Sequence, residues 1–337
     1  MGAGGAGPRI FPSSLIAPGG PHVPGGHSPS GTAQVSRMRK PESGRLPRHS
    51  MVPDLRIGCC SWTADSWWGR VYPEKLPERD RLSWYASLYD TVEVDSTYYR
   101  DPGSLLFRRW ASATPERFIF ALKFPRDLLD PRGPVGRDKV HAFLSHIREL
   151  GPKLGPVLLQ FPPWVRPGRA TRFLEELLGE LDDGIRYAVE LRDKGWFQGE
   201  VFRRLARILG DRTISLAWSC LTYVEIPPAV TADLVYLRFI GDHETIPAQR
   251  HGEVRVDRTP ELRAWSDRLR ESIQERSLGV FVYFNNHFEG FAPASVNRFR
   301  IGMGLPPVEY APGPPAGVAP PSDPRSAHDW RSLDEPP

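Results

Sequence analysis

Short runs of β-branched and aromatic residues alternate with amphipathic stretches between residues 51 and 304. A run of four to eight such residues between turn residues predicts a strand, whereas apolar residues three and four apart predict a helix. The pattern predicts eight strands, at residues 55–59, 91–95, 118–123, 156–161, 186–191, 213–217, 233–239 and 280–284. Helices are expected at residues 81–89, 104–112, 139–150, 170–178, 198–209, 260–276 and 294–301. Residues 218–232 contain two consecutive prolines and predict no helix.

Strand–helix alternation repeated eight times predicts an α/β fold of the (β/α)₈ TIM-barrel type, formed by a single domain. A doubly wound open sheet is the alternative, but it usually has fewer strands and a glycine-rich first turn. The first turn here reads Gly-Cys-Cys-Ser-Trp at residues 58–62, and no GxGxxG follows a strand. Walker A, GxSxG and HExxH motifs are also missing from the sequence. No strong motif therefore identifies a reaction.

Composition divides the chain into three parts. Residues 1–50 contain 8 Pro and 10 Gly, and residues 305–337 contain 10 Pro and 2 Gly. Such segments bury too little apolar surface to fold, so both are expected to be disordered tails around a barrel domain at 51–304. The first tail has six Lys or Arg against one Glu and accounts for the net charge of +4. The barrel is therefore not expected to bind nucleic acid. The only contact with nucleic acid that we expect is weak, salt-dependent binding by the first tail.

The sequence predicts a soluble, cytoplasmic protein that does not contact a membrane. No apolar run approaches the roughly 18–20 residues of a membrane span. Three cysteines are too few for a disulfide framework, and their spacing predicts no structural zinc. The amino-terminal residues lack the apolar stretch of a secretory signal, and Met51 is an alternative start of the chain.

Eight sequence blocks occur in order across nearly all of residues 55–295. They are IGCCSW (57–62), WGRVYP (68–73), TVEVDSTYY (91–99), FIFALKFP (118–125), KLGPVLLQFPP (153–163), YAVELRDKGWF (187–197), TADLVYLRFIG (231–241) and YFNNHFEGFA (283–292). With these blocks the middle segment resembles the YecE-like family, also called domain of unknown function 72. The resemblance implies a TIM-type barrel and no particular activity, because the family's reaction is unknown. The chain departs from the family at Cys59 and Cys60, where members commonly carry Thr-Ser.

Ionisable residues stand at the carboxyl ends of four predicted strands, where TIM barrels carry their active sites. A charge inside an apolar strand is costly unless it is paired, so these residues are expected to face one another. The candidates for catalysis are Glu93, Asp95, Lys123 and Glu190. The candidates for substrate binding are Gln160, Arg192, Arg238, Asn285, Asn286, Trp62, Tyr98 and Trp218.

Parity along the strands sharpens this prediction. Glu190 and Arg192 are two residues apart, so both are expected to point into the barrel mouth beside Glu93, Asp95 and Lys123. Glu190 or Glu93 would move protons, and the cations would hold anionic groups. One asparagine of the pair after the last strand is expected to bond a charge at the rim. The alternative interpretation is a purely structural network, because three acids balance three bases.

These residues predict an enzyme (a hydrolase, lyase or isomerase) that uses acid–base chemistry on a small polar or anionic ligand such as a sugar, sugar phosphate or nucleotide fragment. One alternative is a metal-dependent phosphoesterase or nuclease-type barrel, with ligands from Glu93, Asp95, Glu190, His243 and His287. The sequence does not require a metal, since three cations at the same rim oppose a divalent ion. The other alternative is a ligand-binding module without turnover. Cys59 has no histidine partner in the sequence and is interpreted as a small buried residue.

Overall fold

The computed structural model describes residues 55–275 and 278–310. The expected tail at 1–50 and most of the one at 305–337 lie outside the described residues. The described part contains nine strands, which are β1 (Leu55–Cys59), β2 (Thr91–Val94), β3 (Ile119–Lys123), β4 (Leu154–Gln160), β5 (Tyr187–Glu190), β6 (Ser215–Leu216), β7 (Trp218–Cys220), β8 (Leu234–Phe239) and β9 (Gly279–Phe284). All eight expected strands are present. The sixth, expected at residues 213–217, contains β6, whereas β7 directly after it was not predicted.

The strands form two parallel sheets, one in the order β1-β9-β8-β7 and the other in the order β2-β3-β4-β5-β6. The α/β class with parallel strands is therefore confirmed. The chain changes partner at Ala217, because β6 pairs with β5 whereas β7 pairs with β8. The amide of Ala217 still donates to the carbonyl of Val189, at 2.9 Å. One extended segment thus contributes to both sheets.

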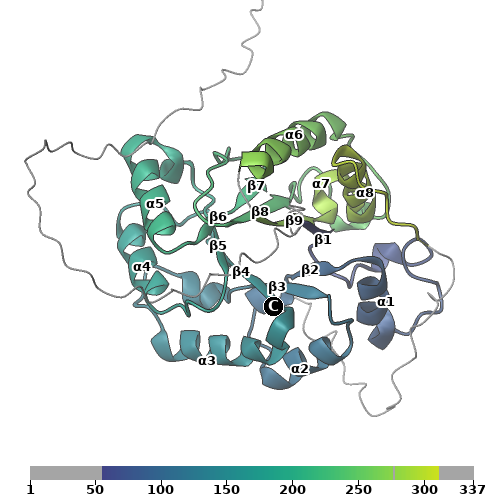
Figure 1. Ribbon diagram of the computed structural model, residues 1–337, viewed down its shortest axis with the longest axis horizontal. Helices are drawn as coiled ribbons and strands as arrows, with labels where there is room; N and C mark the ends of the chain where they lie inside the picture. Colours follow the sequence, from purple (N-terminus) through teal and green to yellow (C-terminus); the bar gives the residue numbers. More distant parts are fainter. Residues whose placement is uncertain (1–54, 276–277, 311–337) are drawn as a thin grey trace, which may run out of the picture. The chain divides into compact units, whose positions relative to one another are not determined.

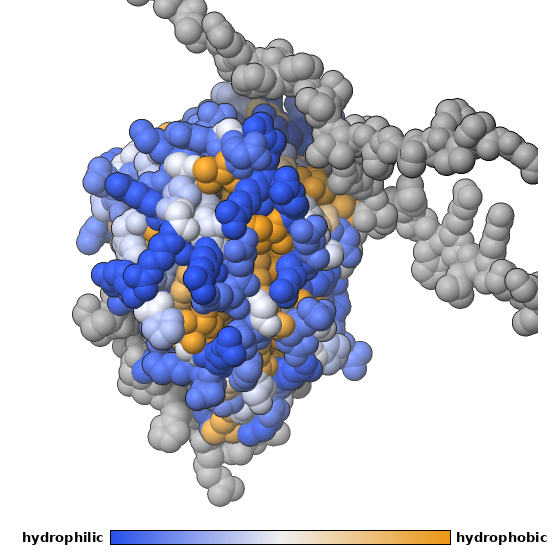
Figure 2. All heavy atoms as spheres, turned by 90° about the vertical axis from the view of Figure 1, so that its left-hand side faces the viewer, coloured by the Kyte–Doolittle hydropathy of each residue, from blue (hydrophilic) through white to orange (hydrophobic). Residues whose placement is uncertain are grey.

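Helices lie around the strands, as Figure 1 shows. They are α1 (Arg81–Leu88), α2 (Ser104–Ser112), α3 (Arg137–Ile147), α4 (Arg169–Leu178), α5 (Gly199–Asp211), α6 (Thr259–Glu275), α7 (Asn286–Glu289) and α8 (Ala292–Gly302). As the two prolines predicted, no helix lies between β7 and β8. On the side of α4 and α5, hydrophobic residues form patches among many hydrophilic residues (Figure 2).

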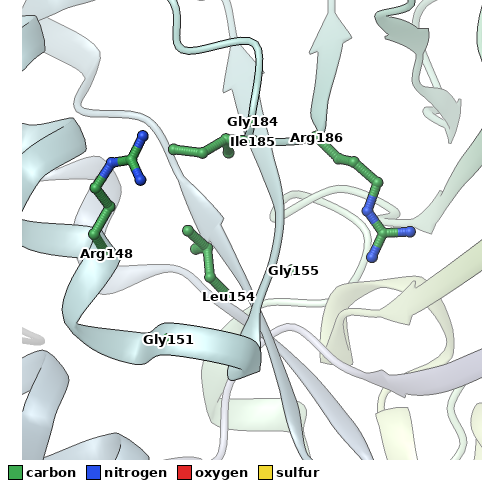
Figure 3. A pocket seen from close by; sticks show the side chains of 7 residues that line it. All are labelled: Arg148, Gly151, Leu154, Gly155, Gly184, Ile185 and Arg186. Carbon is green, nitrogen blue, oxygen red and sulfur yellow. The ribbon is translucent and has the colours of Figure 1, made fainter.

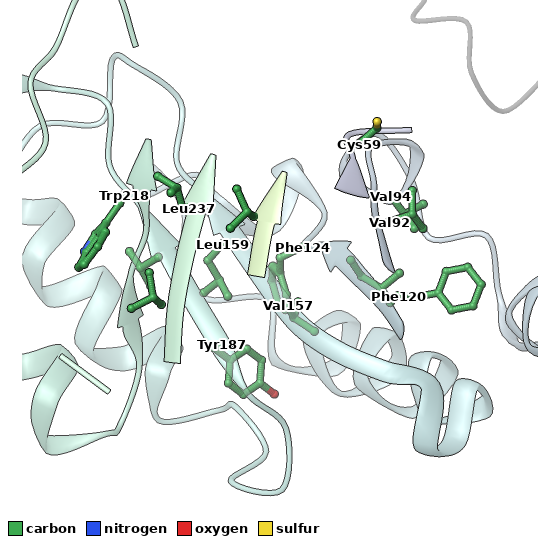
Figure 4. Packing of buried hydrophobic residues seen from close by; sticks show 14 of the residues in the cluster. Cys59, Val92, Val94, Phe120, Phe124, Val157, Leu159, Tyr187, Trp218 and Leu237 are labelled. Carbon is green, nitrogen blue, oxygen red and sulfur yellow. The ribbon is translucent and has the colours of Figure 1, made fainter. Parts of the chain in front are cut away.

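Each strand has two chemically different faces, because successive side chains point in opposite directions. On one face, large apolar side chains pack in the main core; Figure 4 shows Val92, Phe120, Val157 and Leu237 among them. We call the other face the inner face. It carries a second, smaller cluster that includes Cys60, Ala121, Leu158, Ala188, Ala217, Tyr236 and Tyr283. Ala121 and Ala188 are small, which leaves room for the longer polar side chains of Lys123 and Glu190 that follow along the same strands.

The two sheets approach closely at β1 and β2. Gly58 has no side chain there, and a Cβ at this position would lie 2.2 Å from the carbonyl oxygen of Thr91. The Tyr85 hydroxyl bridges the two strands by accepting from the amide of Cys59 (2.8 Å) and donating to the Thr91 carbonyl (3.0 Å). The hydroxyls of Thr91 and Tyr283 are 2.7 Å apart. Side-chain hydroxyls thus connect the sheets where the backbone ladder stops.

The packed chain continues beyond residue 304, where the folded segment was expected to end. Asn297 donates to the carbonyl of Val308 and accepts from its amide, at 3.0 and 2.7 Å. The Tyr310 hydroxyl donates to the carbonyl of Pro293 and lies 2.9 Å from the Tyr89 hydroxyl. Residues 305–310 are therefore part of the fold. Within the described residues, no helix is both long and apolar enough to cross a membrane.

Candidate functional site

Polar side chains form a layer on the inner face, at the carboxyl ends of the strands. Lys123, Glu190 and Arg238 each stand two residues after a member of the smaller cluster. The alternation of side chains along a strand places them on the same face. We call the following six residues the charge cluster: Glu93, Asp95, Lys123, Glu190, Arg192 and Arg238. The predicted grouping of these side chains is confirmed by the contacts below.

Arg238, on β8, occupies the centre of the charge cluster and is 1% exposed. Its Nε and Nη2 donate to the two carboxylate oxygens of Glu93, at 2.8 and 2.7 Å. Its Nη1 donates to the carboxylate of Glu190 and, at 3.2 Å, to the amide oxygen of Gln160. One guanidinium therefore joins two carboxylates that belong to β2 and β5. Burial would lower the pKa of Arg238, but Glu190 and Glu93 raise it, so the side chain is a permanent cation.

Glu190 is fully buried and surrounded by donors. Arg192 donates to its Oε1 at 2.5 Å, and Arg238 and the hydroxyl of Ser219 donate to its Oε2. Burial would raise the pKa of Glu190, but Arg192 and Arg238 outweigh it and lower the pKa below the usual range. Glu190 is therefore held as a carboxylate, which makes it a poor proton carrier near neutral pH.

Glu93 is held in a similar way. In addition to Arg238, the hydroxyl of Tyr236 donates to it at 2.8 Å, and Lys123 Nζ lies 3.9 Å from its Oε1. Burial opposes ionisation, but the cations Arg238 and Lys123 prevail and lower the pKa of Glu93. Both buried glutamates thus remain charged while their lone pairs are occupied by donors.

Asp95 differs from the two glutamates. It follows β2 directly, and 34% of its side chain is exposed, while its Oδ1 lies 2.7 Å from Lys123 Nζ. Burial and the nearby carboxylate of Glu93 raise the pKa of Asp95 against the opposing effect of Lys123. The Lys123 ammonium is destabilised by burial, but Asp95 and Glu93 raise its pKa. Asp95 is therefore the carboxyl group that both reaches solvent and is shifted toward the titration range of an acid or base.

Of the three aromatic residues predicted to bind substrate, only Tyr98 contacts the charge cluster. Tyr98 lies beside the charge cluster, with Lys123 Nζ 5.6 Å from its ring centroid. Trp218 does not: it is 1% exposed and packs against Trp265 of α6 on the main-core face. Trp62 packs edge to face on Trp110 of α2, with centroids 5.4 Å apart. The prediction that Trp218 lines the opening is wrong, because Ala217 and Ser219 occupy the inward positions of that segment.

Neither asparagine after β9 bonds a member of the charge cluster, which corrects that expectation. The side chain of Asn285 accepts from the amide of His287 and caps α7. Asn286 Oδ1 accepts from Trp67 Nε1 at 3.2 Å and from the amide of Ala292 at 2.9 Å. Both side chains stabilise the turn that leads into α7 and α8. The chain has already left β9 at these positions, so neither side chain points to the inner face.

Three histidines lie close together, two in the loop after β8 (His243 and His251) and one in α7 (His287). The rings of His243 and His287 are 3.8 Å apart between centroids, and those of His251 and His287 are 4.4 Å apart. His287 is buried rather than exposed, and its Nδ1 lies 2.6 Å from the carbonyl oxygen of Ile246. Burial and the neighbouring His287 lower the pKa of His251 to about 4. In residues 55–275 and 278–310, no group of three His, Cys, Asp or Glu has an arrangement that could hold a metal ion.

Comparison with known proteins places the chain in a family. The model of the family described as "Protein of unknown function DUF72" matches residues 56–316. The chain belongs to the DUF72 family. The UPF0759 protein YunF of Bacillus subtilis is 26% identical over 300 residues, which cover 79% of this chain and 98% of YunF. The UPF0759 protein YecE of Escherichia coli K12 is 30% identical over 166 residues, 48% of this chain and 57% of YecE.

Solved structures of DUF72 proteins share the fold. A DUF72 protein of Thermotoga maritima has a TM-score of 0.63 and 23% identity, covering 74% of this chain and 99% of its own. A DUF72 protein of Enterococcus faecalis has a TM-score of 0.61 and 22% identity, covering 74% and 96%. The resemblance seen in the sequence blocks is thereby confirmed. The family description names no activity, so the chemistry has to be argued from the side chains.

Two partners of the charge cluster in this DUF72 protein were missed by the sequence reasoning. Tyr236 and Ser219 donate to Glu93 and Glu190, respectively. Tyr236 precedes Arg238 by two residues, so the same parity argument could have found it. Cys59 is buried among apolar side chains, and burial raises its pKa, which agrees with its interpretation as a small core residue.

A cavity of about 330 Å³ lies elsewhere in the fold. It is lined by Arg148, Gly151, Leu154, Gly155, Gly184, Ile185 and Arg186 (Figure 3). Leu154 begins β4 and Arg186 precedes β5, so the cavity lies at the amino ends of these strands. It is therefore at the opposite end from the charge cluster, and Arg148 is already paired with Asp182.

Proposed function

We propose that the protein is an enzyme that performs acid–base chemistry on a small polar or anionic substrate at the carboxyl-end mouth of a (β/α)₈ barrel. Asp95 and Lys123 are the reacting pair. Glu93, Glu190 and Arg238 are positioning residues, which hold that pair in place and fix its electrostatics. The observation that carries the proposal is the contrast between Asp95, a partly exposed carboxyl group with a raised pKa, and the two buried carboxylates with lowered pKa values.

Closure of the two sheets into a barrel is supported by their two junctions. At the first, the Tyr85 hydroxyl bridges β1 and β2, and Gly58 permits the backbones to approach. At the second, β6 and β7 are separated by Ala217 alone. Arg238 of one sheet also binds Glu93 and Glu190 of the other. Such a barrel would bring the carboxyl ends of all strands to one opening.

The roles follow from the protonation states. A general acid or base acts best when its pKa lies near the working pH, and Asp95 is the carboxyl group shifted in that direction. A protonated Lys123 next to it can stabilise negative charge that develops on the substrate. Arg192 is 16% exposed in its side chain and can hold an anionic substituent while it remains bonded to Glu190. This arrangement suits a hydrolase, lyase or isomerase whose transition state carries an oxyanion.

The test is to incubate the purified full chain with a metabolite extract and to follow every metabolite by mass spectrometry. The parent protein should deplete at least one metabolite and accumulate its product. Asp95→Asn should deplete none, whereas Asp267→Asn, in an exposed pair with Arg270 on α6, should behave like the parent. A metabolite that co-purifies unchanged, with no depletion by the parent, would instead assign a ligand-binding module. Depletion that requires added Mg²⁺, Mn²⁺ or Zn²⁺ would move the function to the metal-dependent class and overturn the proposed mechanism.

A further inference from the structure

A row of rings and cations leads from the charge cluster to the protein surface. Tyr98 and Tyr99 lie at the turn that follows Asp95. Lys123 Nζ is 5.6 Å from the Tyr98 ring centroid, the rings of Tyr98 and Tyr99 meet edge to face at 5.5 Å, and the guanidinium carbon of Arg126 is 5.8 Å from the Tyr99 ring centroid. We call Lys123, Tyr98, Tyr99 and Arg126 the entrance row.

Exposure increases along the entrance row. The side chain of Lys123 is 9% exposed, Tyr98 is half-buried, Tyr99 is 47% exposed and Arg126 is exposed. The row begins at the cation that touches Asp95, the member of the charge cluster that reaches solvent. A ligand that contacts Tyr99 and Arg126 could therefore extend along the row toward Asp95.

Among the described residues, no carboxylate neutralises the positive charge of Arg126. Arg126 forms no ion pair in the described part of the chain. The adjacent Asp127 pairs with Lys139 instead, with 3.6 Å between Oδ2 and Nζ. Further along the same β3–α3 connection, Arg132 lies over the exposed ring of Trp164 at 4.6 Å, but Asp130 binds its guanidinium. The charge cluster itself contains as many acids as bases. Arg126 is thus a cation beside an exposed aromatic ring that can bind an anionic ligand. Arg132 also lies beside an exposed aromatic ring, but Asp130 neutralises its charge.

We infer that the substrate is an anionic molecule with a planar ring. The ring packs on Tyr99, the anionic group binds Arg126, and the reacting polar group reaches Asp95 and Lys123. The inference rests on the proposed function and adds the substrate class to it. A flat π system packs on a tyrosine more favourably than a saturated ring does, and a guanidinium binds phosphate or carboxylate through charged hydrogen bonds.

Three probes separate these contributions: inorganic phosphate, cyclohexyl phosphate and phenyl phosphate, titrated calorimetrically into the full chain. Phenyl phosphate should bind about fivefold more tightly than cyclohexyl phosphate. Tyr99→Ala should remove that preference, and Tyr99→Phe should retain it. Arg126→Gln should weaken both organic phosphates about tenfold. The matched control Arg132→Gln should leave all affinities unchanged, and unaltered melting temperatures should show that every variant is folded.

Three outcomes would each overturn the inference. Phenyl phosphate does not bind measurably, the phenyl and cyclohexyl probes bind with equal affinity, or Arg126→Gln and Arg132→Gln have equal effects. These outcomes are distinct from failure of the proposed function. If the entrance row binds phenyl phosphate as described but the parent protein converts no metabolite, the ligand class stands and the enzyme proposal falls. If metabolites that lack a ring or a charge are converted and the conversion depends on Asp95, the enzyme proposal stands and the ligand class falls.

Discussion

Replacing Glu190 with Gln tests whether the charge cluster supports the fold. The substitution keeps the shape of the side chain and removes its charge. Glu190 accepts from Arg192, Arg238 and Ser219, and an amide offers one oxygen where the carboxylate offers two. In the variant, an NH₂ group would face at least one of these donors. Arg238 would then retain only Glu93 as a buried counterion.

The expected cost follows from this loss. Removing one partner of a buried ion pair costs about 3–5 kcal/mol, because the other charge stays buried without compensation. We expect about 3 kcal/mol here, at the lower end, since Arg238 keeps its two bonds to Glu93. For a domain of this size, that corresponds to a fall of about 6–12 °C in melting temperature. The lowered pKa of Glu190 means that its contribution is present at pH 7 and is lost as the pH falls below its unfolded pKa of about 4.3.

Calorimetric or fluorescence melting at pH 7 measures this effect directly. Glu200→Gln is the matched control, because Glu200 forms an exposed pair with Arg203 on α5. That variant should melt at the temperature of the parent. A Glu190→Gln protein as stable as the parent, or more stable, would refute the reasoning. It would mean that the charge cluster is strained in the native state and that Glu190 is kept for chemistry.

Three further predictions follow from other features. Asp95→Asn should be about as stable as the parent at pH 7, since the raised pKa shows that folding disfavours its charged form; a melting temperature as low as that of Glu190→Gln would contradict this. The pKa of His251, lowered to about 4, means that the unfolded chain binds a proton more readily than the folded one. The free energy of unfolding should therefore decrease as the pH falls from 7 toward 4, and denaturant titrations of His251→Gln should show a smaller decrease. An equal decrease with pH in the parent and in His251→Gln would refute the lowered pKa of His251. Gly58→Ala should cost about 1–3 kcal/mol, because its Cβ would clash with the Thr91 carbonyl, whereas Gly133→Ala, with nothing within 4 Å, should cost little in a thermal melt.

The sequence predicted much of the charge cluster, because strand parity depends only on spacing. Glu93, Lys123, Glu190 and Arg238 stand near the ends of strongly apolar runs, so their common face followed from the alternation of side chains. Trp218 was misplaced because it was expected after the sixth strand, whereas the chain changes sheets at Ala217 and continues as β7. That change depends on partners far away in the sequence.

The assignment of chemical roles could not be made from the sequence. Glu190 was expected to move protons, but two arginines and a serine surround it and fix its charge. Asp95 takes that role in the proposal because its side chain is partly exposed, while burial of the carboxyl group and the neighbouring Glu93 raise its pKa. A pKa depends on burial and on the neighbours in space, which spacing along the chain does not specify.

The position of Arg238 has a consequence for how the chain folds. The five-stranded sheet is built from the continuous segment 91–216, whereas Arg238 comes from the four-stranded sheet, which the two ends of the domain assemble. Until both sheets meet, Glu93 and Glu190 have only Lys123 and Arg192 of their own segment as cations and lack the guanidinium that binds them both. Arg238 in turn lacks both of its carboxylates until then, so each half gains these ion pairs only when the other is present, and partly folded species should be sparsely populated. Arg238 thus couples the folding of the two ends of the chain to that of its middle, together with the hydroxyl contacts of Tyr236 and Ser219.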